Sequence, residues 1–115
     1  MLVILIALPL AALLVAVVSQ LGGNGVLGRN GFVGLRIPST MFSDESWRAG
    51  HHAAAPAAWI GFVATTLAAI VGLVFVSTDS GSIVVSIIVG AFFVATLIWA
   101  VAAANMAARS AELLD

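Results

Sequence analysis

The polar chemistry of this chain is concentrated in residues 30–52, which have the sequence NGFVGLRIPSTMFSDESWRAGHH. This segment holds two of the four cationic residues, two of the five acidic residues and both histidines. An arginine such as Arg36 can pair with a nearby carboxylate, with a lipid phosphate or with a carboxylate of a partner protein. The residue types therefore indicate binding, or internal bracing, within a single loop.

Known catalytic patterns do not accompany these residues. Serine, histidine and aspartate all occur, but the chain has no nucleophile elbow, no His-Glu-x-x-His pattern and no phosphate-binding loop. His51 and His52 are adjacent, so their side chains would point about 100° apart on a helix. The chain also has no cysteine to complete a metal site. We therefore expect no enzyme activity, no metal and no cofactor.

The composition identifies lipid as the solvent of the folded chain. Of the 115 residues, 63% are hydrophobic and only 8% are charged, a balance that a small water-soluble domain could not cover with polar groups. The net charge of −1 gives no reason to expect a nucleic acid partner. The absence of cysteine also excludes disulfide bonds.

Three apolar segments are long enough to cross a bilayer, whose hydrocarbon core of about 30 Å requires about 20 helical residues. We predict an all-α membrane protein with transmembrane helices over residues 1–21, 53–77 and 83–106. A turn over 78–82 and a tail over 107–115 complete the expected order. The first segment could instead be a secretory signal. No basic residue precedes it and no A-x-A-like cleavage site follows it, so we interpret it as a retained span.

The arginines predict how the chain is oriented in the membrane. Three of the four lie in the loop over residues 22–52, and the fourth, Arg109, lies in the tail. The positive-inside rule then places the loop and the C-terminus in the cytoplasm. The N-terminus and the turn between the second and third spans are expected outside.

The loop is expected to combine irregular backbone with a short helix. Its first part, residues 22–31, contains five glycines and two asparagines, a composition typical of turns. Ser43 is then a predicted helix N-cap, followed by acids that suit the first turn of a helix. We predict a short interfacial helix over residues 44–52, and Pro56 predicts a kink or a new helix start before the second span.

Two aspects of this loop leave alternatives open. Arg36 is either an internal clamp that closes the loop onto Asp44 or Glu45, or a residue that binds a partner. Trp47 is either an anchor at the membrane interface or part of a recognition surface, where it would lie one helical turn from His51.

Four other residues of the loop have expected backbone roles. Gly34 lacks a side chain and Pro38 fixes its own backbone angle, so both are expected to set the shape of the loop. The side chains of Asn30 and Thr40 can satisfy backbone amides of the loop.

The order of these residues resembles the signature loop of the SdpI family of small bacterial integral membrane proteins, with the pattern Asn30-x-x-x-Gly34-x-Arg36-x-Pro38-x-Thr40 and then Asp44-Glu45-x-Trp47-x-x-x-His51. The chain departs from that pattern at Ser39, where relatives often have an aromatic residue. It departs again at His52, where they often have arginine.

The resemblance implies a protein that protects the producing cell from a secreted peptide toxin and that, in the founding case, also holds a repressor at the membrane. It implies no enzymatic activity and a location in the inner membrane of a bacterial cell. The candidate binding or structural residues carried over are Asn30, Gly34, Arg36, Pro38, Thr40, Asp44, Trp47 and His51.

Small residues recur at every fourth position of the last two apolar segments, in the rows Ala64–Ala68–Gly72, Gly61–Thr65–Ala69 and Ser86–Gly90. Such rows let helices approach closely in lipid, so we expect them to pack the second span against the third or against another protein. Two functions remain open: toxin immunity or signal transduction through protein–protein contact, and a role as accessory subunit of a larger membrane complex. The expected partners are the lipid bilayer and either a peptide toxin or another membrane protein, with the oligomeric state open.

Overall fold

The computed structural model describes residues 1–75 and 79–113, and within them the chain forms three helices and no strand. The helices are α1 (Leu2–Gly23), α2 (Asp44–Phe75) and α3 (Asp79–Glu112). Each is long and apolar enough to cross a membrane. The prediction of an all-helical chain with three helices long and apolar enough to span a membrane is therefore confirmed.

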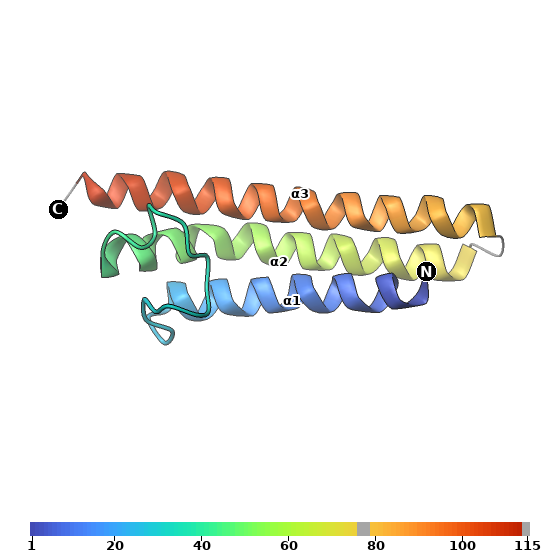
Figure 1. Cartoon of the computed structure of the whole chain (residues 1–115), viewed down its shortest axis with the longest axis horizontal. Helices are drawn as coiled ribbons and strands as arrows, with labels where there is room; N and C mark the ends of the chain where they lie inside the picture. Colours follow the sequence, from blue (N-terminus) through green and yellow to red (C-terminus); the bar gives the residue numbers. More distant parts are fainter. Residues whose placement is uncertain (76–78, 114–115) are drawn as a thin grey trace.

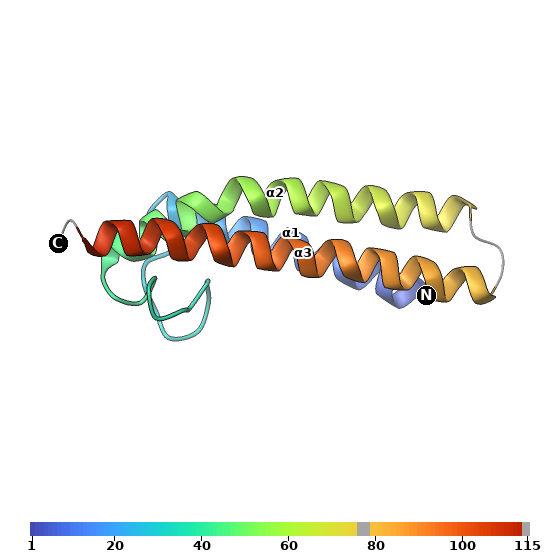
Figure 2. The same ribbon diagram turned by 90° about the horizontal axis from the view of Figure 1, so that it is seen from above.

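The helices form one elongated bundle with extents of 55 × 21 × 20 Å (Figure 1). Helix α2 lies between α1 and α3 in this view and runs antiparallel to both, and the view from above shows α1 behind α3 (Figure 2). All three helices contact one another, and α2 makes the most extensive contacts. The loop between α1 and α2 and the end of α3 consequently lie together at one end of the bundle.

Two helix boundaries differ from the sequence-based prediction. The predicted short helix over 44–52 is not a separate element, because α2 continues from Asp44 through Pro56 to Phe75. The ring of Pro56 is exposed, while the alanines on either side of it are buried and hold both halves of the helix in the bundle: Ala54, Ala55, Ala57 and Ala58. Packing therefore maintains the helix across the lost backbone hydrogen bond.

Helix α3 is also longer than predicted. It begins at Asp79, so most of the expected turn over 78–82 is helical, and it continues to Glu112 through much of the expected tail. Residues 76–78, which include the end of the predicted second span, and residues 114–115 lie outside the described residues.

Small residues bring α2 and α3 together. The side of α3 that faces α2 carries buried small residues at every fourth position: Thr96, Ala100, Ala104 and Ala108. Gly61 lies against Thr96 so closely that a Cβ there would overlap its side chain, and Gly72 lies against Val85 in the same way. The predicted row that starts at Gly61 is therefore part of this interface. Gly90 is not, since a Cβ there would meet nothing within 4 Å.

The outward faces of the three helices carry large apolar side chains. Examples are Leu14, Val74 and Ile98, each more than 60% exposed. Exposed apolar surface on this scale is unusual for a water-soluble monomer but is ordinary for helices surrounded by hydrocarbon. Most of the buried residues of the bundle are instead alanine, glycine, serine or threonine, which matches helix packing in lipid.

Candidate functional site

His51 lies at the centre of the end of the bundle that holds the loop. It is fully buried, its Nε2 accepts a hydrogen bond from the Leu35 backbone N–H at 2.9 Å, and its Nδ1 lies 2.8 Å from the Trp47 carbonyl oxygen. Because a backbone N–H can only donate, Nε2 must be unprotonated, and Nδ1 then carries the proton that is donated to Trp47. His51 therefore connects the loop to α2 as a neutral imidazole.

Burial lowers the pKa of His51 below its ordinary value, and the hydrogen bond to the Trp47 carbonyl opposes this shift to a smaller extent. The residue belongs to the polar first turns of α2, ahead of the apolar segment predicted to begin at residue 53. The lowered pKa and the hydrogen-bond geometry agree, since both favour the neutral ring.

Trp47 is enclosed by the loop. Its side chain is only 2% exposed, its Nε1–H donates to the Leu27 carbonyl oxygen at 2.9 Å, and its ring lies 4.2 Å from the His51 ring, measured between centroids. A side chain this buried is neither an anchor at the membrane interface nor part of an exposed recognition surface, so both interpretations of Trp47 are wrong. Instead its indole joins the first part of the loop to the helix that follows.

Two glycines make room for these aromatic rings. Gly34 has a φ of +128°, a conformation that other residues rarely adopt, and a Cβ there would overlap the ring of Trp47. Gly22, near the end of α1, lies against the His51 ring so closely that a Cβ would overlap it. The predicted role of Gly34 in setting the loop backbone follows from both features.

Asn30 and Thr40 hold the loop backbone together. The Asn30 amide nitrogen donates to the carbonyl oxygens of Gly28 and Val33, each at 2.9 Å, and its oxygen accepts from two backbone N–H groups that follow. Thr40 is fully buried, and its hydroxyl donates to the Leu35 carbonyl and accepts from a backbone N–H three residues before it. Both side chains therefore satisfy loop backbone groups, as expected.

The internal clamp is formed by Arg29 and not by Arg36. The Arg29 guanidinium lies 3.3 Å from the Asp44 carboxylate and donates to the Met41 carbonyl oxygen at 2.8 Å. Arg36 is exposed and makes no ion pair or hydrogen bond with any described residue. Of the two alternatives for Arg36, the clamp is thus wrong. Its guanidinium is free to bind another molecule.

The start of α2 has the cap that the sequence predicts. The Ser43 hydroxyl accepts from the Ser46 backbone N–H at 3.0 Å, and Asp44 and Glu45 occupy the first turn. Pro38 precedes this start as the exposed residue of a turn, which is closed by a hydrogen bond of 3.0 Å from the Met41 N–H to the Ile37 carbonyl.

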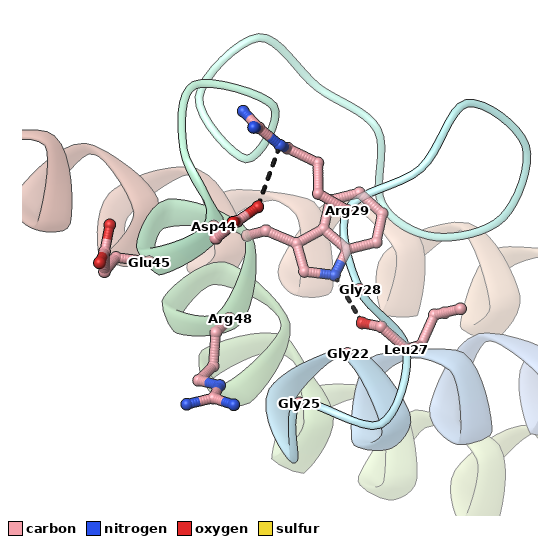
Figure 3. A pocket seen from close by; sticks show the side chains of 9 residues that line it. Gly22, Gly25, Leu27, Gly28, Arg29, Asp44, Glu45 and Arg48 are labelled. Atoms are coloured by element: carbon pink, nitrogen blue, oxygen red, sulfur yellow. Dashed lines mark hydrogen bonds and ion pairs between the residues drawn. The ribbon is translucent and has the colours of Figure 1, made fainter.

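A pocket of about 290 Å³ opens where the loop meets α2 (Figure 3). Arg29 reaches toward Asp44 on one side of it, while Arg48 extends the other way, near Gly25 at the end of α1. With Glu45 also lining it, the pocket has two cationic and two acidic side chains. This balanced charge gives the pocket no preference for an anion.

The structure brings some candidate residues together and leaves others apart. Gly34, Trp47 and His51 form one contacting cluster, to which Thr40 is joined through Leu35. Arg36 and Pro38 are exposed, and Asn30 braces the outer part of the loop. Sequence reasoning missed residues outside this set that help to hold the site: Gly22, Leu27 and Arg29.

Gln20 is a further contact that the sequence did not suggest. Its side-chain oxygen accepts from Trp59 Nε1 at 3.2 Å, which joins α1 to α2 below the loop. Of the missed residues, Gly22 is the one that a sequence signal could have identified, because a glycine at the end of an apolar segment is compatible with the close approach of another side chain.

These features define a multi-pass membrane protein whose first two helices are tied together by a hydrogen-bonded loop. The model of the SdpI/YfhL protein family matches residues 26–104, which is more than half of the chain. The chain belongs to this family, which is not known as a family of enzymes. Comparison with curated proteins and with solved structures finds no match to either.

Proposed function

We propose that this protein acts without catalysis, as a toxin-immunity or signal-transducing protein that binds another protein through its loop. Membership of the SdpI/YfhL family supports the immunity type. The observation that carries the proposal is the contrast between Arg36 and the rest of the candidate site. The other loop contacts are internal, whereas the Arg36 guanidinium is exposed and unpaired among the described residues.

A braced loop is suited to recognition because little conformational entropy is lost when a partner binds it. Phe32 is 93% exposed and follows Asn30, whose amide fixes the backbone around it. Aromatic residues, including phenylalanine, and arginine are enriched at protein interfaces relative to the rest of the surface. We infer that Phe32 and Arg36 contact the partner, with Arg36 pairing with one of its carboxylates.

We further propose that the loop faces the cytoplasm from the inner membrane of a bacterial cell, with the N-terminus outside. The chain has no cysteine, so single cysteines report topology cleanly. A membrane-impermeant maleimide should label a Ser80→Cys variant in intact cells and a Phe32→Cys variant only after the membrane is opened. The reverse labelling pattern would reject this orientation.

The immunity function is tested by deleting the gene and exposing the deletion strain to the peptide fraction of its own culture supernatant. We expect the deletion strain to lose viability and a plasmid copy of the wild-type gene to restore it. Equal survival of the deletion strain and its parent would reject immunity to a secreted peptide of that strain.

A second candidate function is that of an accessory subunit in a larger membrane complex. A groove between α2 and α3 favours it, because two small residues of a predicted row, Ala64 and Ala68, line this groove together with Phe92. Small residues in an open groove would let a helix of another protein approach closely. Purification of the tagged protein in mild detergent, at native expression level, distinguishes the two functions. Co-purification of a large membrane protein in stoichiometric amount would support the accessory-subunit function. Recovery of the protein alone would support the immunity function.

A further inference from the structure

A groove runs along one face of α3 where the loop crosses it. Its apolar part is lined by Ile37 of the loop and by Leu97, Ile98, Val101 and Ala102 of α3, with Asn105 at its end. The second hollow is lined by Pro38, Ser39 and Phe42 of the loop, by Arg109 and Glu112 of α3, and by Leu113 just after the helix. Ile37 and Pro38 are consecutive in the loop, and Asn105 and Arg109 lie about one turn apart on α3, so the two hollows are neighbours along this helix, and the term groove covers both.

The polarity of this groove changes in a fixed order along α3. On α3 itself, apolar residues up to Ala102 are followed by the Asn105 amide and then by the charged side chains of Arg109 and Glu112, beside which Phe42 and Leu113 add apolar surface. At about 1.5 Å per residue, Ala102 and Glu112 are separated by about 15 Å along the helix. A phospholipid has the same order over a comparable length: acyl chain, ester, phosphate and headgroup.

The polar groups of the groove lack partners within the described part of the chain. Arg109 and Glu112 lie three residues apart on one helix, yet they form no ion pair with each other or with another described residue. Asn105 likewise makes no side-chain hydrogen bond to any residue that the structure describes. Ser39 is only 5% exposed, and its hydroxyl has no hydrogen-bond partner there. Of these groups only the Ser39 hydroxyl is buried, and a buried hydroxyl is stabilised by a ligand that supplies its missing partner, whereas the more exposed Arg109, Glu112 and Asn105 side chains are available to pair with that ligand.

We propose that this groove binds one phospholipid of the phosphatidylethanolamine type. Its phosphate pairs with Arg109 and accepts from the Ser39 hydroxyl, its ammonium pairs with Glu112, and an acyl chain lies against Ile37 and Ala102. One cation and one anion in the groove complement one phosphate and one ammonium. An anionic phospholipid would leave the Glu112 carboxylate without a partner, and a choline headgroup has no N–H to donate to it.

The test uses the full-length protein in mild detergent with equal amounts of phosphatidylethanolamine, phosphatidylcholine and phosphatidylglycerol that carry identical acyl chains. Retained lipid is measured by native mass spectrometry. We expect phosphatidylethanolamine to be retained over phosphatidylcholine by about tenfold, the factor typical of one charged hydrogen bond. Glu112→Gln should remove this preference, whereas Arg109→Gln should lower retention of both lipids.

Matched controls come from the other charged pair with the same spacing. Glu45 and Arg48 are exposed, lie three residues apart on α2 and are outside the groove, so Glu45→Gln and Arg48→Gln should leave retention unchanged. Ala102→Trp should lower retention of every lipid without changing a charge, and circular dichroism checks that each variant keeps its helices. Equal retention of the ethanolamine and choline lipids by the wild type would overturn the proposal. Preferential retention of phosphatidylglycerol, or equal losses in the control variants, would also overturn it.

Discussion

At the scale of single residues, His51 makes two hydrogen bonds that require opposite states of its two ring nitrogens. Nε2 accepts from the Leu35 N–H, and Nδ1 donates to the Trp47 carbonyl. A proton added at Nε2 would therefore face the Leu35 N–H and break the connection between the loop and α2. This makes the end of the bundle that holds the loop sensitive to pH.

The pKa of His51 is lowered in the folded state, so folding favours the neutral ring. The contribution of His51 to stability should be complete above its ordinary pKa of about 6.5 and should be lost as the pH falls through its folded-state pKa. We expect the Tm in detergent to fall as the pH is lowered from about 7.5 to about 5, a range that includes the ordinary histidine pKa and the values below it. His51→Gln removes the titrating ring, so its Tm should change less over this range. Equal pH dependence in both proteins would contradict this account.

Gly34 offers a second test at this scale. Gly34→Ala adds a Cβ that overlaps the Trp47 ring and that disfavours the positive φ, so it should lower the free energy of unfolding by about 1–3 kcal/mol. Gly28→Ala is the matched control, because Gly28 lies in the same loop, has no positive φ and has open space around its Cα. Thermal unfolding in detergent measures both. A control that loses as much stability as Gly34→Ala would contradict the assigned role.

At the scale of elements, the packing of α2 on α3 depends on close approach at Gly61. Gly61→Ala should separate the two helices at Thr96 and lower the free energy of unfolding by about 1–3 kcal/mol. Gly90→Ala, in the apolar segment of α3, meets open space and should be neutral or slightly stabilising because alanine favours the helix. Thermal unfolding of both variants in the same detergent measures the difference in stability. Equal Tm values would show that the close approach of the helices at Gly61 does not stabilise the protein.

The number and type of the secondary-structure elements could be predicted from the sequence. The composition indicates a membrane protein, and a chain that crosses the hydrocarbon core must satisfy its backbone hydrogen bonds within long apolar helices. The start of α2 could also be predicted, since Ser43 and the two acids after it act locally. The continuity of α2 through Pro56 could not, because it depends on packing against the other helices.

The candidate site was predictable in its members but not in its contacts. The sequence identified Trp47 and His51 as neighbours on one helix, which the structure confirms. It could not identify Leu27 as the acceptor for Trp47, or Arg29 rather than Arg36 as the partner of Asp44. These pairings depend on the path of the irregular backbone between α1 and α2, for which glycine-rich sequence specifies flexibility rather than a single conformation.

At the scale of the whole molecule, three helices position one braced loop at one end of an otherwise apolar bundle (Figure 1). The bundle surface is suited to lipid along most of its length, so the loop is the part of the chain best equipped to recognise a soluble peptide or a regulator. Arg36 is a charged residue of the family pattern that makes no ion pair or hydrogen bond with any residue the structure describes.

The most direct test of this account is the survival of the deletion strain, challenged with the peptide fraction, when it carries an Arg36→Gln copy. We predict that Arg36→Gln leaves the Tm within error of the wild type but fails to protect the cells, because it removes a partner contact and no internal one. Arg48→Gln, which changes another exposed arginine, should protect fully. Full protection by Arg36→Gln would contradict the account.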